Sequence, residues 1–103
     1  MALIEYLIEV EFPINVLFGT NLSRYVVKTC LSDLSITLKE LLRRLNDELI
    51  KSNRFEGYLD GGSGFYVFVN DNLVRDISTP LKELIEPSNK HIKIKILPIF
   101  EGG

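Results

Sequence analysis

The sequence is poor in the residues that most often build reactive or metal-binding sites. It contains one cysteine, Cys30, and one histidine, His91, and it has no tryptophan. A single cysteine excludes an internal disulfide and any cysteine-rich metal site, so we expect no bound metal. No uncharged run approaches the roughly 18 apolar residues of a membrane helix, and the first residues lack a signal-peptide pattern. We therefore expect a cytoplasmic protein without a membrane segment.

The chain also has no large excess of positive or negative charge. The 103 residues include 12 basic and 14 acidic side chains, which gives a net charge of −2, and the basic ones are scattered. A domain without a basic patch is not expected to bind nucleic acid directly. Hydrophobic residues make up 46% of the chain and charged residues 25%, which is typical of one soluble globular domain.

The first third of the chain predicts two neighbouring strands. Apolar and polar side chains alternate from Leu3 to Phe12, as in a strand with one buried and one wetted face. We expect Pro13 to end this strand and residues 14–21 to form a connection. The β-branched and aromatic run from Arg24 to Leu31 predicts a second strand, and the short connection favours an antiparallel pair.

Residues 38–51 predict the main helix. Thr37 and Glu40 have the spacing of a capping box, in which each side chain bonds to a backbone amide of the other residue. A stripe of leucines at three- and four-residue steps then predicts a face that packs on the core: Leu38, Leu41, Leu42, Leu45 and Leu49.

Residues 52–64 contain four of the seven glycines, and we expect a mobile loop there. The Gly-Gly-Ser-Gly run does not predict a phosphate cradle, because no lysine with serine or threonine follows it and a strand comes next. The following strand is expected over Phe65–Val69. A tight turn at Asn70-Asp71-Asn72, whose residues tolerate positive φ, should join it to a short strand over residues 73–75.

The last part of the chain predicts a helical turn, a strand and a tail. Thr79-Pro80 has the pattern of a helix start, with a hydroxyl N-cap and proline at the first helical position. The last strand should begin near Lys90, since isoleucines then alternate with lysines through Ile96. Pro98 cannot donate to a ladder, so pairing should lapse there. We expect a domain over residues 1–97 and a flexible tail over residues 98–103.

No internal group of residues has the pattern of a catalytic site. Cys30 lies in a predicted strand, where a small buried side chain is its common role, and a Cys–His pair would form only if it met His91. Three glutamates on the wetted face of the first strand are better explained as solubilising residues than as a cation site: Glu5, Glu9 and Glu11. They could pair with Lys93 and Lys95 if the first and last strands are neighbours. We expect a protein that is not an enzyme and that binds no cofactor itself.

The predicted order of elements is strand, strand, helix, strand, strand, helical turn, strand. This order indicates an α+β fold, with one main helix on one face of a mixed sheet. Together with the strand–turn–strand of residues 68–75, Thr79-Pro80-Leu81, and the strand–proline–Gly102-Gly103 end, it resembles the ubiquitin-like β-grasp sulfur carriers. That family includes the small subunit of molybdopterin synthase (MoaD), the thiamine sulfur carrier (ThiS) and the ubiquitin-related modifier. The MoaD-like members are the most similar, and the resemblance implies a β-grasp sheet of four to five strands.

The resemblance also implies a function for the C-terminus. An E1-like activating enzyme would use ATP to adenylate the Gly103 carboxylate, and a sulfur donor would convert it to a thiocarboxylate. The product would donate sulfur in molybdopterin (molybdenum cofactor) biosynthesis, with a large synthase subunit or a thiolase as the further partner. Gly102 and Gly103 have no Cβ, which would let the chain end enter a narrow site. The alternatives are a ubiquitin-related modifier, for tRNA thiolation or lysine conjugation or both, and a β-grasp interaction module with an inert tail.

Apolar residues near the start of the tail predict a partner-binding segment. If Ile92, Ile94 and Ile96 face the core, Leu97 points outward, and Ile99 and Phe100 have no evident internal partner. Exposed apolar clusters often form binding surfaces, and an aromatic anchor among aliphatic residues is a common interface hot spot. We therefore expect partner contacts at three residues: Leu97, Ile99 and Phe100.

Overall fold

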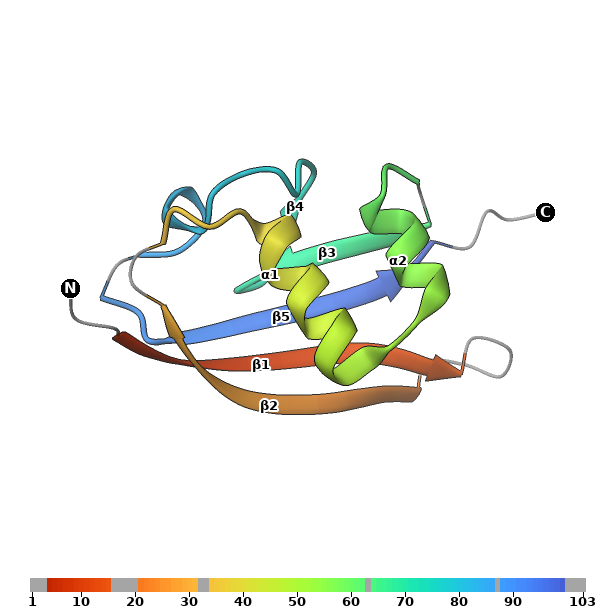
Figure 1. Cartoon of the computed structure of the whole chain (residues 1–103), viewed down its shortest axis with the longest axis horizontal. Helices are drawn as coiled ribbons and strands as arrows, with labels where there is room; N and C mark the ends of the chain where they lie inside the picture. Colours follow the sequence, from red (N-terminus) through yellow and green to blue (C-terminus); the bar gives the residue numbers. More distant parts are fainter. Residues whose placement is uncertain (1–3, 16–20, 32–33, 63, 87, 100–103) are drawn as a thin grey trace.

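The computed structural model describes residues 4–15, 21–31, 34–62, 64–86 and 88–99, with only the backbone described at 13–15 and 21–23. Five strands form one mixed sheet in the order β2-β1-β5-β3-β4 (Figure 1). Their bounds are β1 (Ile4–Asn15), β2 (Asn21–Leu31), β3 (Phe65–Val69), β4 (Asn72–Val74) and β5 (His91–Pro98). β1 and β5 are parallel and the other pairs are antiparallel, so the last strand of the chain lies in the centre of the sheet.

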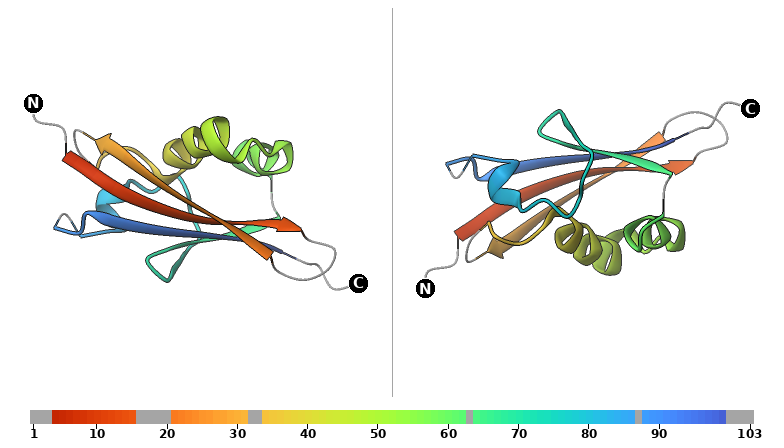
Figure 2. Two further views of the ribbon diagram at one scale, coloured as in Figure 1. Left: turned by 90° about the horizontal axis from the view of Figure 1, so that it is seen from below. Right: turned by 90° about the horizontal axis from the view of Figure 1, so that it is seen from above.

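The helices lie on one face of this sheet (Figure 2). They are α1 (Leu38–Leu45), the π-helical turn η1 (Asn46–Ile50), α2 (Asn53–Leu59) and the 3₁₀ turn η2 (Leu81–Glu83). The core forms between the two layers from the alternate residues of the central strands and the leucines of α1. This arrangement confirms the predicted α+β fold, with one main helix on a five-stranded mixed sheet of the β-grasp kind. No helix among the described residues is long and apolar enough to cross a membrane.

The start of α1 shows one half of the predicted capping box. The hydroxyl of Thr37 accepts a hydrogen bond from the amide of Glu40 at 3.2 Å. The Glu40 carboxylate accepts a hydrogen bond from this hydroxyl at 3.3 Å, instead of from the Thr37 amide. The first four of the predicted stripe residues are buried, which fixes α1 on the core: Leu38, Leu41, Leu42 and Leu45.

The main helix ends at Ile50, within one residue of the prediction, although it widens into a π-turn after Leu45; its C-cap, Lys51, has a left-handed φ of 55°. The prediction for residues 52–64 is wrong. The segment predicted as a mobile loop contains α2 instead. The hydroxyl of Ser52 caps this second helix by accepting from the Phe55 amide at 3.2 Å, and Phe55 and Leu59 are buried one turn apart. Burial of these two side chains outweighs the low helix propensity of Gly57.

Strand β1 also differs from the prediction, because it continues past Pro13 to Asn15 and pairs there with the start of β2. β5 pairs with β1 only over Leu7–Glu11, so β2 is the neighbour of β1 at Pro13. A proline without an N–H is tolerated in a strand that has a partner on one side only.

The helical turn near residue 80 begins later than predicted. Pro80, rather than Thr79, occupies the N-cap position of η2, and no side chain caps this turn. The Thr79 carbonyl instead accepts a hydrogen bond from the Leu38 amide at 3.0 Å, and Thr37 forms a bridge with Pro80. Residues 79–80 are therefore attached to the start of α1, and these contacts determine the backbone geometry of residues 79–80.

The turn between β3 and β4 agrees with the prediction. Asn70 and Asp71 have φ values of 48° and 70°, which these residue types tolerate. The side chain of Asn70 also accepts a hydrogen bond from the Lys93 amide at 2.9 Å, so the turn is attached to β5.

Candidate functional site

β5 ends directly before the tail that the sequence predicts to be functional. Pro98 is the final residue of β5, is buried, and pairs with Phe65 of β3. The Ile99 amide then donates to the Gly64 carbonyl at 2.8 Å. Regular pairing thus extends one residue beyond the expected domain boundary at 97. The expected site residues Phe100, Gly102 and Gly103 lie outside the described residues.

A group of apolar side chains lies over β3, β4 and the end of β5 on the outer face of the sheet, which is the face without helices. Val67 and Val69 face the core, so the alternating residues Tyr66 and Phe68 face outward. In the strand register Tyr66 is opposite Leu97, and Phe68 is opposite Leu73. Tyr66 is 47% exposed and Leu73 is 39% exposed. We call this group the outer apolar patch: Tyr66, Phe68, Leu73 and Leu97.

Only Leu97 of this patch is among the partner contacts that the sequence predicts. The signal for Tyr66 and Phe68 is that β3 is apolar on both faces, since every residue from Phe65 to Val69 is aromatic or valine. A strand that is apolar on its outer face indicates a surface for another molecule when that face is not covered. Ile99 is half-buried and lines a shallow groove of about 270 Å³ beside Tyr66 and Leu73, so it adjoins the patch.

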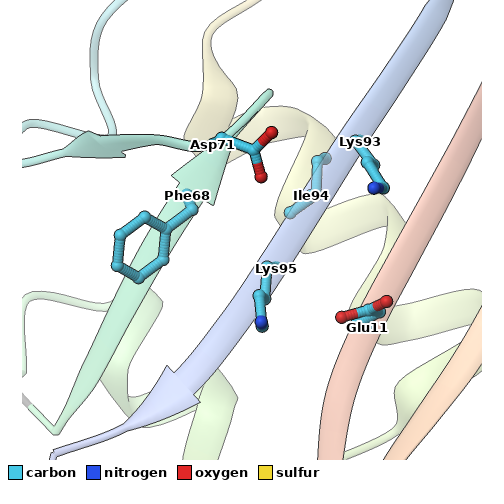
Figure 3. A pocket seen from close by; sticks show the side chains of 6 residues that line it. All are labelled: Glu11, Phe68, Asp71, Lys93, Ile94 and Lys95. Carbon is cyan, nitrogen blue, oxygen red and sulfur yellow. The ribbon is translucent and has the colours of Figure 1, made fainter.

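A small charged pocket of about 100 Å³ lies next to the patch on the same face (Figure 3). Its lining comes from β1, β3, β5 and the β3–β4 turn: Glu11, Phe68, Asp71, Lys93, Ile94 and Lys95. Two lysines face two carboxylates, so the pocket has no excess charge with which to select a cation or an anion. Small-molecule sites usually have at least about 300 Å³, so this pocket is better described as part of a charged rim.

The glutamates of β1 form ion pairs with a residue that the sequence analysis did not name. Arg24 of β2 lies 3.0 Å from Glu9 and 3.1 Å from Glu11. The predicted proximity of β1 and β5 is correct, because Lys93 and Lys95 stand opposite these glutamates in the register. Among the described residues, however, the ion pairs of Glu9 and Glu11 are with Arg24 and His91 rather than with the lysines.

Cys30 and His91 do not form a catalytic pair. They lie on β2 and β5, which are separated by β1, so about 10 Å separates the two strands. Cys30 is exposed, which corrects the prediction of a buried residue: it belongs to the outward-facing half of β2. His91 Nε2 lies 3.5 Å from Glu9 Oε2 on the surface. No group of three or more metal-ligating side chains occurs within the described part of the chain.

Two side chains near α2 have raised pKa values. Burial raises the pKa of Tyr58, which packs in an aromatic cluster with Phe55 and Phe65 at ring-centroid distances of 5.7 and 5.6 Å. A hydrogen bond to Asp60, 2.7 Å long, raises the pKa of Arg43. Both changes favour the protonated form, so neither side chain is prepared to act as a base.

A scan against protein-family models and a search of curated proteins both found no match to this chain. The interpretation of the site therefore rests on the fold, the outer apolar patch and the position at which β5 ends.

Proposed function

We propose that this chain is a ubiquitin-like sulfur carrier whose Gly103 carboxylate becomes a thiocarboxylate that donates sulfur in molybdopterin biosynthesis. The observation that carries this proposal is the position of β5. The last strand lies in the centre of the sheet, between β1 and β3, and it ends beside the outer apolar patch. A carrier needs this combination of a rigid domain, a docking surface and a chain end next to it.

The chemistry would take place in the partner enzymes. A carboxylate oxygen of Gly103 attacks the α-phosphate of ATP bound to an E1-like enzyme, and pyrophosphate leaves. A persulfide of the sulfur donor then displaces AMP and forms an acyl disulfide. A thiol reductant attacks the donor-side sulfur of that S–S bond, which releases the thiocarboxylate and leaves a disulfide between the reductant and the donor. Since Ile99 is still bonded to Gly64, four residues follow it, and they reach at most about 14 Å when extended. Glycines at 102 and 103 would let this short segment enter a narrow site.

The carrier domain would contribute the docking surface. Leu97 belongs to the outer apolar patch and Ile99 adjoins it, so a partner that contacts the patch also contacts the start of the tail. Burial of exposed aromatic and leucine side chains is the main favourable term in such interfaces. Phe100, two residues after Pro98, would act as a further anchor.

The test is reconstitution with the cognate activating enzyme, ATP and a sulfur source, followed by intact mass spectrometry. A first measurement establishes that the protein carries a free carboxylate on Gly103. Conversion should then replace one oxygen by sulfur on that residue. Gly103→Ala should still bind the activating enzyme but should not be converted. Tyr66→Ser, in the patch, should bind the enzyme weakly while keeping an unchanged tail.

Three other outcomes would replace or change the proposal. Lysine-linked conjugates without any thiocarboxylate would indicate a protein modifier. Deletion of Gly102 and Gly103 without effect on enzyme binding, conversion or cell growth would indicate an interaction module with an inert tail. A thiocarboxylate that is used only by a tRNA thiolase would retain the carrier but change its acceptor.

A further inference from the structure

Among the described residues, no strand pairs with the outer side of β2. β2 has 11 residues, and β1 is its one neighbour in the described sheet, whereas β4 at the opposite edge has three residues. Figure 1 shows β2 along the lower margin of the sheet. Its register with β1 runs from Leu31 to Leu22 without a bulge. Proteins usually shorten, bend or cover edge strands, because free backbone N–H and C=O groups pair with other chains.

The core is also incompletely closed along β2. Ile8 and Val10 of β1 are fully buried, but Val27 and Tyr25, which stand opposite them in the register, are only partly buried. On the outer face of the same strand, Val26 is 56% exposed. A further strand beside β2 would therefore cover apolar surface on both faces of the sheet, in addition to pairing backbone groups.

The charges of this edge indicate the chemistry of the added strand. Arg24 and Lys28 are both exposed and, like Val26, lie on the outer face. On its β1 side Arg24 pairs with Glu9 and Glu11. Lys28 stands opposite Leu7, and no described carboxylate lies within ion-pair distance of it. The edge thus has a positive charge that β1 does not compensate.

We propose that β2 binds an extended segment of a partner protein, in which glutamate or aspartate alternates with β-branched residues, as an added edge strand. Acidic side chains of the segment would lie beside Lys28 and Arg24 on the outer face. Its β-branched side chains would cover Tyr25 and Val27 on the inner face. β1, with its alternating glutamates, already presents this pattern to the other side of β2.

A second copy of this chain fits the edge less well than an acidic segment. In an antiparallel pair of two β2 strands that brings the two Val26 side chains together, Arg24 of one copy stands opposite Lys28 of the other. Like charges directly opposite each other destabilise a strand pair. The proposal concerns a surface distant from the tail, so it does not depend on the sulfur-carrier function.

The test is a titration of the isotopically labelled full chain with a capped peptide of sequence Val-Glu-Val-Glu-Val-Glu-Val, followed by NMR. We expect the amide signals of residues 24–31 to shift and those of β4 to stay in place. Two further probes carry N-methyl groups on all valines or on all glutamates. The amides of alternate residues point to the same side of a strand, so either the valine or the glutamate N–H groups face β2. The probe that is methylated on those amides should not bind, and the other probe should.

Reversal of the charge at residue 28 tests whether Lys28 contacts the acidic side chains of the peptide. Lys28→Glu should weaken binding of the glutamate peptide about tenfold and strengthen binding of the matching Val-Lys peptide, because a cross-strand attraction becomes a repulsion. Lys82→Glu, on the exposed turn η2, makes the same charge change elsewhere and should alter neither affinity.

Three results would overturn the proposal. The first is equal binding of both N-methylated peptides, and the second is shifts confined to the outer apolar patch. The third is a concentration-dependent dimer, seen by sedimentation, that excludes the peptide.

Discussion

Among the described residues, Asn46 is the one polar side chain in the buried interior, with 3% of its surface exposed. It lies in the first turn of η1, and it makes two hydrogen bonds to the backbone of Ser52. Its side-chain amide donates to the Ser52 carbonyl at 3.2 Å, and its side-chain oxygen accepts from the Ser52 amide at 2.9 Å. These bonds close the turn around Lys51, whose φ is 55°, and so connect the first helix to the second.

Replacement of Asn46 by alanine should destabilise the fold by about 2–4 kcal/mol. Each lost hydrogen bond contributes about 1 kcal/mol net, and each partly buried backbone group left unpaired adds about 1 kcal/mol or more. Ser52→Ala is the matched control, because it keeps both backbone groups of residue 52 and removes only the hydroxyl that caps α2. Loss of that cap should cost about 1 kcal/mol.

Urea unfolding followed by circular dichroism measures both free energies of unfolding. The slope of the free energy of unfolding against urea concentration should be the same for the two variants, since both unfold the same domain. If Asn46→Ala costs less than Ser52→Ala, or less than about 0.5 kcal/mol as at ordinary surface sites, water replaces the two bonds. The claim that Asn46 connects the helices would then be refuted.

Three further predictions test other parts of the structure. Thr37→Ala should lower the free energy of unfolding by about 1 kcal/mol in the same urea assay, because the Glu40 amide loses its cap. Burial raises the pKa of Tyr58 above its value of about 10 in the unfolded chain. The contribution of Tyr58 to the free energy of unfolding is therefore fully present below about pH 10 and is lost as the pH rises through the folded-state pKa. Tyr58→Phe should reduce this loss of stability at alkaline pH, as measured by thermal melts at a series of pH values. Phe100→Ala should leave the melting temperature nearly unchanged and weaken binding to the activating enzyme by about 2 kcal/mol, whereas a large loss of stability would place Phe100 in the core.

The sequence predicts the central parts of the fold because the patterns there are local. In β1 and β5 the side chains alternate with period two between the core and the solvent, and the register of the two strands follows this alternation. Thr37 and Glu40 predict the start of α1 because both partners of the cap lie within one helical turn. In such segments local preference and tertiary packing require the same conformation.

The errors occur where contacts beyond a single helical turn or strand determine the local structure. The helical pattern of residues 38–51 does not reveal the π-turn, which accompanies the two hydrogen bonds between Asn46 and Ser52. The spacing of Phe55 and Leu59, one helical turn apart, is a signal for α2, but the surrounding glycines favour a loop. The side of β2 on which Cys30 lies depends on its register with β1, which the β2 sequence alone does not determine.

The second helix also bears on how the chain end is presented to a partner. Phe55 and Tyr58 of α2 pack against Phe65, with ring centroids 5.3 and 5.6 Å away. Phe65 is the residue that pairs with Pro98 at the end of β5. The aromatic cluster therefore supports β5 at the point where the tail begins. Ile99 is also held there, because its amide donates a hydrogen bond to the Gly64 carbonyl. Because each residue ordered on binding costs roughly 1–2 kcal/mol of conformational entropy, holding Ile99 in place before binding favours tight docking of a partner at this end of the sheet.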